Sequence, residues 1–282
     1  MNKKNLKYVV YSFFLFLSIE IIVQSKGYGI MDYIKSFAGL QSYSDRLSKD
    51  LNVTFSNGVS EKNIPAHWII KQSDELESHA PAVKSNARAI HVFGLLAEEF
   101  AKLPEKAASI LNYIVITQDL KNVGLQAAGI YDSKVGAVYI STNSNVEPFD
   151  DVFMISTFHH ELSSMLMEKY HFDESGWRKI LGENFKYESD KNPFYFIAVL
   201  ENDVELKNDE YYFKRGLVSY YGETGVENDY NEYVGMIFSE PEKMKLLISE
   251  YPKIKEKYAY IKSFYLSIDQ GFQPFFDKID AG

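Results

Sequence analysis

The spacing of apolar and polar positions predicts three helices in the chain. Apolar residues recur every three or four positions over residues 93–103, and Pro104 ends this pattern. A second helical pattern covers residues 151–170. The third, over residues 254–268, keeps its apolar residues on one face, which predicts an amphipathic helix near the C-terminus.

Between the first two helices the pattern changes to that of β-strands. Residues 113–117 form a run rich in β-branched side chains and predict a strand. Residues 129–131 and 137–141 predict the two strands of a hairpin, and residues 132–136 supply its turn. Strands flanked by helices in this order predict one α+β domain, which we place over residues 65–282.

The segment before this domain has a different character. Three lysines precede an apolar run over residues 8–19, and residues 23–25 fit a cleavage site, so residues 1–25 are predicted to be an export signal. An uncleaved anchor is the alternative, although the run is short for a membrane span of about 20 residues. Residues 26–64 predict a tether with short helical pieces. We therefore expect a periplasmic or secreted protein, or one held at the membrane only by this segment.

Composition narrows the chemistry that the chain can carry. It has 282 residues, 46% of them hydrophobic and 24% charged, as expected of a globular protein. The formal net charge of −9 argues against a nucleic-acid-binding protein, which needs a basic face to neutralise phosphates. The absence of cysteine excludes disulfides, iron–sulfur clusters and thiol catalysis. A protein-bound metal would therefore need His, Asp or Glu as ligands.

The most informative motif lies in the helix predicted over residues 151–170. In a zinc peptidase helix, His, Glu and His stand at positions i, i+1 and i+4. The two imidazoles then lie one turn apart and bind the metal, while the Glu polarises the metal-bound water. Here His160 and Glu161 occupy the first two positions, but Ser164 stands at the third. The motif is therefore incomplete at one metal ligand.

A second carboxylate follows in a later predicted helix. Zinc peptidases of the Glu-ligand class complete their site with a carboxylate from a second helix, some tens of residues after the His–Glu pair. Glu232 stands at such a position and precedes an apolar run, which would hold its helix beside the first. Glu232 is therefore the candidate for this ligand.

The order of these parts resembles the bacterial family assigned as zinc-binding metallopeptidases, distantly related to the catalytic domain of anthrax lethal factor. The resemblance covers residues 89–270. It implies a zincin-like α+β fold with a small mixed sheet, a His–Glu active-site helix and a C-terminal helical part. The other segments that carry the resemblance are Lys102-Leu103-Pro104, Tyr113–Thr117, Gly129-Ile130-Tyr131, Trp177, Asn184–Tyr187, Glu227–Phe238 and Tyr251–Lys255.

The resemblance also implies roles for single residues. His160 and Glu232 would bind zinc, and Glu161 would act as the general base in hydrolysis of a peptide or protein substrate. Tyr220 or Tyr221 would supply a hydroxyl to the transition state, as a tyrosine does in related proteases.

The serine at position 164 leaves the zinc site with two protein ligands, whereas catalytic zinc sites have three and a water. Three compensations are open. His159 could bind the metal, although adjacent helical side chains point about 100° apart. His171 could fold back from the loop after the helix. Ser164 could hold a water in place of the missing imidazole.

Two functional hypotheses follow. In the first, the protein is an exported zinc metallopeptidase that hydrolyses peptide bonds with metal-activated water. In the second, the site has decayed, and the scaffold is a binding protein of the cell envelope. Its cleft would then bind a peptide or a partner chain by strand addition along the edge of the predicted hairpin.

Other residues have ordinary structural interpretations. His159 is expected to be a hydrogen-bonded histidine of the core or of the surroundings of the site. Glu227 and Asp229 stand at a helix start, where negative charge favours the helix dipole. Three further histidines have no partner at ligand spacing and are expected at the surface: His67, His79 and His91.

Overall fold

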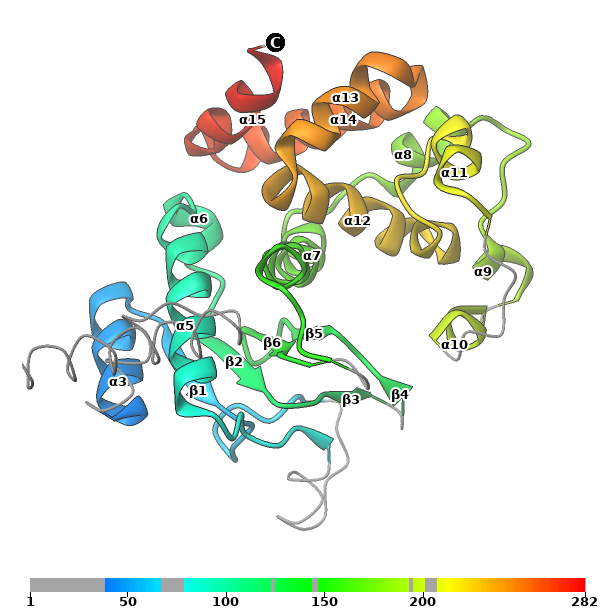
Figure 1. Cartoon of the computed structure of the whole chain (residues 1–282). Helices are drawn as coiled ribbons and strands as arrows, with labels where there is room; N and C mark the ends of the chain where they lie inside the picture. The colour runs from blue at the N-terminus through cyan, green and yellow to red at the C-terminus, as the bar shows by residue number, and fades with distance from the viewer. Residues whose placement is uncertain are drawn as a thin grey trace, which may run out of the picture.

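A small mixed β-sheet, a long central helix and a C-terminal group of helices make up the fold (Figure 1). The structure is a computed structural model of the chain and describes residues 39–66, 79–122, 125–143, 147–192, 195–200 and 207–281. The predicted signal at residues 1–25 and His67 lie outside these ranges. No helix within them is long and apolar enough to cross a membrane.

The elements fall into two halves on either side of the central helix. The first half comprises α3 (Leu40–Leu51), β1 (Thr54–Asn57), α5 (Asn86–Ala101), α6 (Glu105–Ala108), β2 (Tyr113–Thr117), β3 (Lys121–Asn122), β4 (Leu125–Gln126), β5 (Gly129–Asp132) and β6 (Ala137–Ser141). The central helix is α7 (Asp151–Lys169). The second half comprises α8 (Glu174–Leu181), α9 (Glu188–Lys191), α10 (Tyr195–Leu200), α11 (Asp209–Arg215), η1 (Tyr221–Thr224), α12 (Val226–Ser239), α13 (Pro241–Glu250), α14 (Pro252–Ile268), η2 (Gln270–Phe272) and α15 (Gln273–Asp280).

The main sheet has the strand order β1-β2-β6-β5. Strands β1, β2 and β6 run parallel to one another, whereas β5 is antiparallel to β6 and forms one edge. The hairpin turn between β5 and β6 includes Gly136 at φ 72°, a left-handed conformation that suits glycine. Strands β3 and β4 form a separate antiparallel pair.

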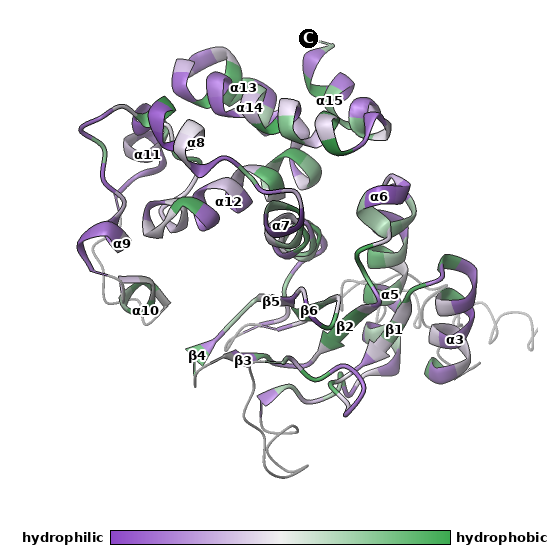
Figure 2. Cartoon of the chain, turned by 180° about the vertical axis from the view of Figure 1, so that it is seen from behind, coloured by the Kyte–Doolittle hydropathy of each residue, from purple (hydrophilic) through white to green (hydrophobic). Residues whose placement is uncertain are grey.

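The period of two along the strands divides the core between the two faces of the sheet. Ile114 and Ile116 of β2 face helices α5 and α7 and join the large hydrophobic core. Val115, between them, faces the other side, where it packs with Tyr139 and Leu120 in a smaller cluster. Figure 2 shows strongly hydrophobic residues on β2 and α7, and others on the C-terminal helices.

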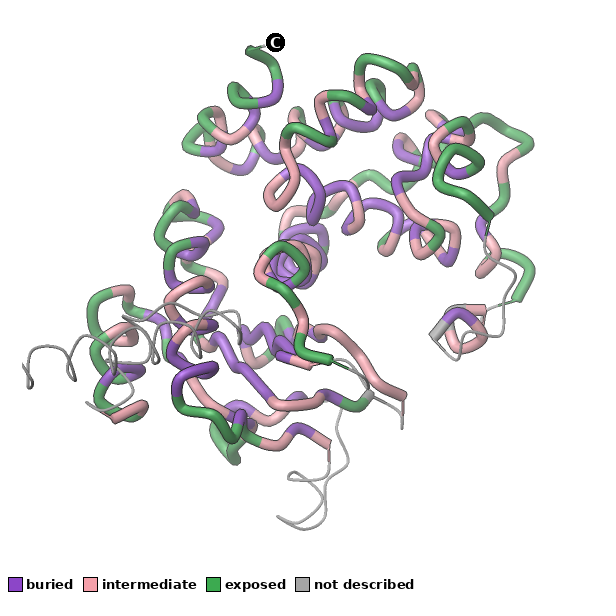
Figure 3. The backbone as a smooth tube through the Cα atoms, viewed as in Figure 1, coloured by how far each residue is buried: buried purple, intermediate pink, exposed green. Residues whose placement is uncertain are grey.

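Helix α7 lies between the sheet and the C-terminal helices, so both sides of it are covered (Figure 3). Its N-cap is Asp150, whose side chain accepts a hydrogen bond from the Phe153 backbone N–H at 2.7 Å. Within residues 157–167, every residue except His160 is buried. A helix buried on nearly all sides has little choice of rotation about its axis, and this fixes the direction of each functional side chain.

A buried ion pair holds α12 against α14. Lys257 Nζ donates to Asp229 Oδ2, and both side chains are fully buried. The same oxygen accepts hydrogen bonds from the Trp177 indole at 2.9 Å and the Tyr187 hydroxyl at 2.5 Å. These contacts join four segments of the C-terminal half through one carboxylate. Asp229 thus has a structural role beyond its predicted place at a helix start.

The structure confirms the α+β class, the small mixed sheet, the central His–Glu helix and the C-terminal helical part. The three predicted helices correspond to α5, α7 and α14, and the predicted hairpin to β5 and β6. The expected tether differs from what the structure shows. Within residues 26–64, α3 packs on α5, and β1 pairs with β2 as a strand of the main sheet. The folded domain therefore begins before residue 65.

Candidate functional site

The predicted site residues lie where β5, α7, α12 and the residues around η1 come together, a region that we call the cleft. Helix α12 packs along α7 (Figure 1). Strand β5 lies against α7 from the sheet side. The cleft thus has one wall from each half of the fold.

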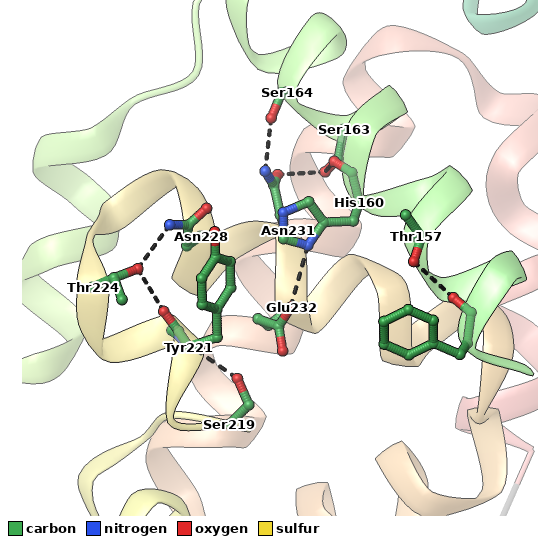
Figure 4. Close-up of polar contacts among 12 residues, drawn as sticks. Thr157, His160, Ser163, Ser164, Ser219, Tyr221, Thr224, Asn228, Asn231 and Glu232 are labelled. Carbon is green, nitrogen blue, oxygen red and sulfur yellow. Dashed lines mark hydrogen bonds and ion pairs between the residues drawn. The ribbon is translucent and has the colours of Figure 1, made fainter. Parts of the chain in front are cut away.

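His160 of α7 and Glu232 of α12 are in direct contact in this region (Figure 4). The distance between His160 Nδ1 and Glu232 Oε1 is 3.2 Å, and the side chains are 15% and 27% exposed. Burial alone would lower the pKa of His160, but the hydrogen bond to Glu232 and the nearby Glu161 carboxylate outweigh it and raise the pKa. Burial would raise the pKa of Glu232, but the bond to His160 outweighs it and lowers that pKa. The two residues therefore favour an imidazolium–carboxylate pair.

Glu161 has a different environment from Glu232. It is only 8% exposed, and among the described residues no hydrogen bond or ion pair reaches its carboxylate. Burial, together with the negative charges of Glu227 and Glu232, raises its pKa to about 7 despite the opposing effect of His160. Gly129 of β5 passes so close that a Cβ there would lie 2.7 Å from Glu161 Cγ. Only glycine allows β5 to approach this side chain.

Ser164 does not face an open metal position. Its hydroxyl accepts a hydrogen bond from Asn231 Nδ2 at 2.7 Å, and the oxygen of the same amide accepts one from the Ser163 hydroxyl. All three residues are buried. The amide of Asn231 thus joins α12 to α7 one turn from His160 (Figure 4), where a zinc peptidase helix carries its second imidazole.

The two tyrosines of the predicted site differ in position. Tyr221 lies beside His160, with ring centroids 6.2 Å apart, and its pKa is raised by burial and then by the Glu161, Glu232 and Glu227 carboxylates. Tyr220 is 41% exposed. Burial and the Glu232 carboxylate raise its pKa as well. Of the two, Tyr221 is therefore the one that packs into the cleft.

Neither of the two histidines considered as substitute ligands reaches the pair. His159 is buried where α7 meets α5 and α12, with its Nε2 3.2 Å from Glu99 Oε2 and its ring stacked on Phe238. This confirms it as a core histidine. His171 is exposed and follows the C-terminal end of α7. At 1.5 Å per residue it lies about 16 Å along the helix from His160.

The other described histidines differ from one another. His91 is not a free surface residue, because its Nε2 lies 2.8 Å from Asp151 Oδ1 and its side chain is 15% exposed. His79 is partly buried.

The residues present do not fit a catalytic zinc ion. Such an ion needs three protein ligands and a water, and the described residues contain no group of three His, Asp or Glu side chains that could hold a metal. His160 and Glu232 converge, but Ser164 is a neutral hydroxyl engaged by Asn231. The donor set is thus incomplete at the position where the sequence departs from the motif.

The sequence does not mark two residues of the cleft, Asn231 and Tyr131, as members of the site. Asn231 adjoins Glu232 and could have been noticed only as the polar residue beside a candidate ligand. Burial raises the pKa of Tyr131 of β5, and the Glu227, Glu168 and Glu161 carboxylates raise it further. Three carboxylates therefore surround one phenol. No sequence signal marks this group, because its members come from three separate elements.

No protein-family model matches the chain, and no curated protein matches it. A solved structure from Bacteroides caccae, described as a "putative zinc-binding metallo-peptidase", is similar to it in fold. The two chains are 14% identical, the similarity covers 85% of this chain and 92% of the other, and the TM-score is 0.46. A likeness of this size assigns neither a family nor an activity. The relation to the lethal factor catalytic domain stays a prediction.

Proposed function

We propose that this chain is a metallopeptidase-like protein whose cleft binds an extended peptide segment along β5 without a catalytic zinc ion. Support comes from the edge of the sheet. Ser141 N–H donates to Ala128 C=O at 2.8 Å, so residues 128 and 141 form a hydrogen-bonded antiparallel pair. Because such pairs alternate along an antiparallel ladder, the backbone groups of Gly129 and Tyr131 point away from β6.

The outward edge of β5 carries the proposal. Among the described residues, no backbone hydrogen bond from another segment occupies the N–H or C=O of Gly129 or Tyr131. An extended peptide can add to such an edge by main-chain hydrogen bonds, while pockets beside it select its side chains. The edge lies directly over α7, next to Glu161. A bound segment would therefore pass the residues of the cleft.

The state of position 164 favours binding over hydrolysis. A zinc peptidase needs an imidazole there, whereas Ser164 and Asn231 bond each other and link α7 to α12. Without that ligand, His160 and Glu232 form an ion pair with each other.

The test targets the outward N–H of β5. Proline is tolerated on an edge strand where the N–H faces away from the ladder, so Tyr131→Pro removes one main-chain donor and keeps the β5–β6 pairing. Random nine-residue peptides displayed on phage are selected on the wild type, and the enriched peptides are synthesised and titrated by fluorescence anisotropy. We expect binding to weaken at least tenfold in Tyr131→Pro.

Tyr131→Ala is the matched control, because it removes the aromatic ring as proline does and keeps the N–H. We expect it to bind the same peptides within about threefold, and both variants should melt as single folded species. Failure to enrich any peptide on the folded wild type would overturn the proposal. So would equal binding by Tyr131→Pro.

A zinc peptidase is the second candidate function. One observation favours it: His160 Nδ1, in the middle of the His–Glu helix α7, already lies 3.2 Å from Glu232 Oε1 of α12. Elemental analysis after zinc exposure and desalting, with His160→Ala beside the wild type, separates the candidates. We expect neither sample to retain zinc. One equivalent in the wild type that is lost in His160→Ala would instead establish a metal site.

We further propose that the protein acts outside the cytoplasm. The support is the lysine-flanked apolar run at residues 8–19 together with the absence of cysteine. Expression of the full chain in a bacterium, followed by fractionation and mass spectrometry of its N-terminus, tests this. A mature chain that begins near residue 26 in the periplasm or medium is the expected result. An intact chain in the cytoplasm would refute it.

A further inference from the structure

A pocket of about 420 Å³ opens beside the C-terminal end of β5. It lies between the β5–β6 turn and the C-terminal half of α7, so it adjoins the outward edge of β5. Its lining residues are Ala66, Ile130, Tyr131, Asp132, Ser133, Lys134, Glu161 and Glu168.

Acidic side chains dominate this lining. Asp132, Glu161 and Glu168 contribute three carboxylates, and Lys134, whose residue is exposed, contributes one cation. The oxygens of Asp132 are occupied, because they accept from the backbone N–H groups of Ala66 at 2.6 Å and Lys134 at 2.9 Å. Asp132 therefore shapes the turn. The carboxylates of Glu161 and Glu168 are the two that remain to bind a ligand in the pocket.

Glu168 and Glu161 differ in their hydrogen bonding. The Ser133 hydroxyl donates to Glu168 Oε2, which fixes that carboxylate at the pocket wall. Glu161 is more than nine-tenths buried, lines the pocket and has no hydrogen-bond partner among the described residues. Its carboxylate is open to the pocket, so a ligand there can supply the hydrogen-bond donors that the described residues do not. This side chain is thus an independent indication of a missing partner.

The missing partner is not a metal ion held by the protein, because the described residues offer no group of three metal-binding side chains. A guanidinium or ammonium group brings several N–H donors of its own and matches carboxylates directly. The phenol of Tyr131 adds an aromatic surface at the same wall, and aromatic faces attract such cations.

We propose that this pocket receives an arginine or lysine side chain of the segment bound along β5. The inference rests on the proposed peptide-binding function and names the class of peptide: one with a basic residue where its chain passes the end of β5. Glu161 and Glu168 pair with the cation.

Two probes test this independently of each other. The first is Nα-acetyl-arginine methylamide, compared with Nα-acetyl-norleucine methylamide, in titrations of the full-length protein followed by NMR chemical shifts. The second is each enriched nine-residue peptide, compared with copies in which each arginine or lysine in turn is replaced by norleucine. We expect the arginine derivative to shift resonances of the pocket and the norleucine derivative to leave them unchanged. In the peptides, one replacement should raise Kd about tenfold, which is about 1.4 kcal/mol.

The double variant Glu161→Gln/Glu168→Gln removes both charges and keeps the side-chain shapes, and we expect it to lose this discrimination. Glu256→Gln, exposed on α14, changes the net charge away from the pocket and should keep it. Peptides that bind equally well with norleucine would overturn the charge inference and leave strand addition intact. Binding of the arginine derivative by a protein that enriches no peptide would support the pocket and refute strand addition.

Discussion

Two buried carboxylates, Asp229 of α12 and Glu161 of α7, have very different surroundings. Asp229 is paired with Lys257, and its Oδ2 also accepts from Trp177 and Tyr187. Glu161, across the interface with α7, is almost as deeply buried and has no partner in the described parts of the chain. A carboxylate that forms an ion pair within the fold has a structural role. A carboxylate without such a pair can still bind a ligand.

The same contrast appears in the cations. Lys257 Nζ donates to Gly216 C=O at 2.7 Å and lies 4.6 Å from the centre of the Trp177 ring. Burial lowers the pKa of Lys257 to about 8, although Asp229 opposes the shift. The cation near Glu161 is His160, and it is paired with Glu232 instead. The buried carboxylate of the C-terminal half therefore has its own ion-pair partner, whereas among the described residues Glu161 has none.

The largest effect should come from breaking the internal pair. Lys257→Met leaves Asp229 buried without its cation, so we expect the free energy of unfolding to fall by about 3–5 kcal/mol. Urea denaturation followed by circular dichroism measures this. Lys191→Met is the control: this lysine pairs with Glu188 at the surface with its side chain 59% exposed, and its loss should cost less than about 1 kcal/mol. Equal effects of the two variants would show that Asp229 does not depend on its cation.

The second prediction concerns the ionisation of Glu161 and its effect on stability as the pH changes. With a pKa raised from 4.5 to about 7, Glu161 in the folded chain keeps a proton that the unfolded chain releases between these values. Its contribution is therefore fully present below pH 4.5 and is lost as the pH rises through 7. Because a tenfold change in proton affinity corresponds to about 1.4 kcal/mol, this loss amounts to about 3 kcal/mol.

Urea denaturation of the wild type and Glu161→Gln at about pH 4.5 and pH 8 measures the effect. Glu161→Gln should gain about 3 kcal/mol on the wild type between these conditions, because glutamine does not ionise. Glu256→Gln, exposed on α14, should track the wild type. If Glu161→Gln also tracks the wild type, the carboxylate is already compensated and the cleft resembles the interior pair.

The sequence predicts the local parts of this fold and misses the parts that depend on distant partners. The apolar period identifies α7, and its N-cap lies directly before it at Asp150. Strand β1 was missed because Thr54–Asn57 is short and polar, and it becomes a strand only by pairing with β2. The pairing of Asn231 with Ser164 spans 67 residues and has no sequence signal at either end. His160, Glu161 and Glu232 were found because a known spacing joins the first two and an apolar helix carries the third.

The third prediction restores the ligand that position 164 lacks. Ser164→His with Asn231→Ala places an imidazole one turn from His160 and removes the amide that now bonds to the residue at that position. We expect this double variant to retain about one equivalent of zinc after desalting. Zinc at about 100 times Kd should then stabilise it by about 2.7 kcal/mol in thermal or urea unfolding. Ser164→Leu with Asn231→Ala supplies similar bulk without a donor and should retain none, and zinc in that control would place the ion elsewhere.

The smallest expected effect comes from removing a tyrosine hydroxyl, either beside Asp229 or in the cleft. Tyr187 is fully buried and donates to Asp229 at 2.5 Å. Its replacement by phenylalanine should cost about 1.5 kcal/mol, the lower end for a hydrogen bond to a charged group. Tyr131 is only partly buried beside the cleft carboxylates, so Tyr131→Phe should change the free energy of unfolding by less than about 0.5 kcal/mol. Urea denaturation resolves the two. If Tyr131→Phe proved the more costly, the cleft would depend on its internal bonds for stability, and Glu227 and Tyr131 would belong with the structural group around Asp229.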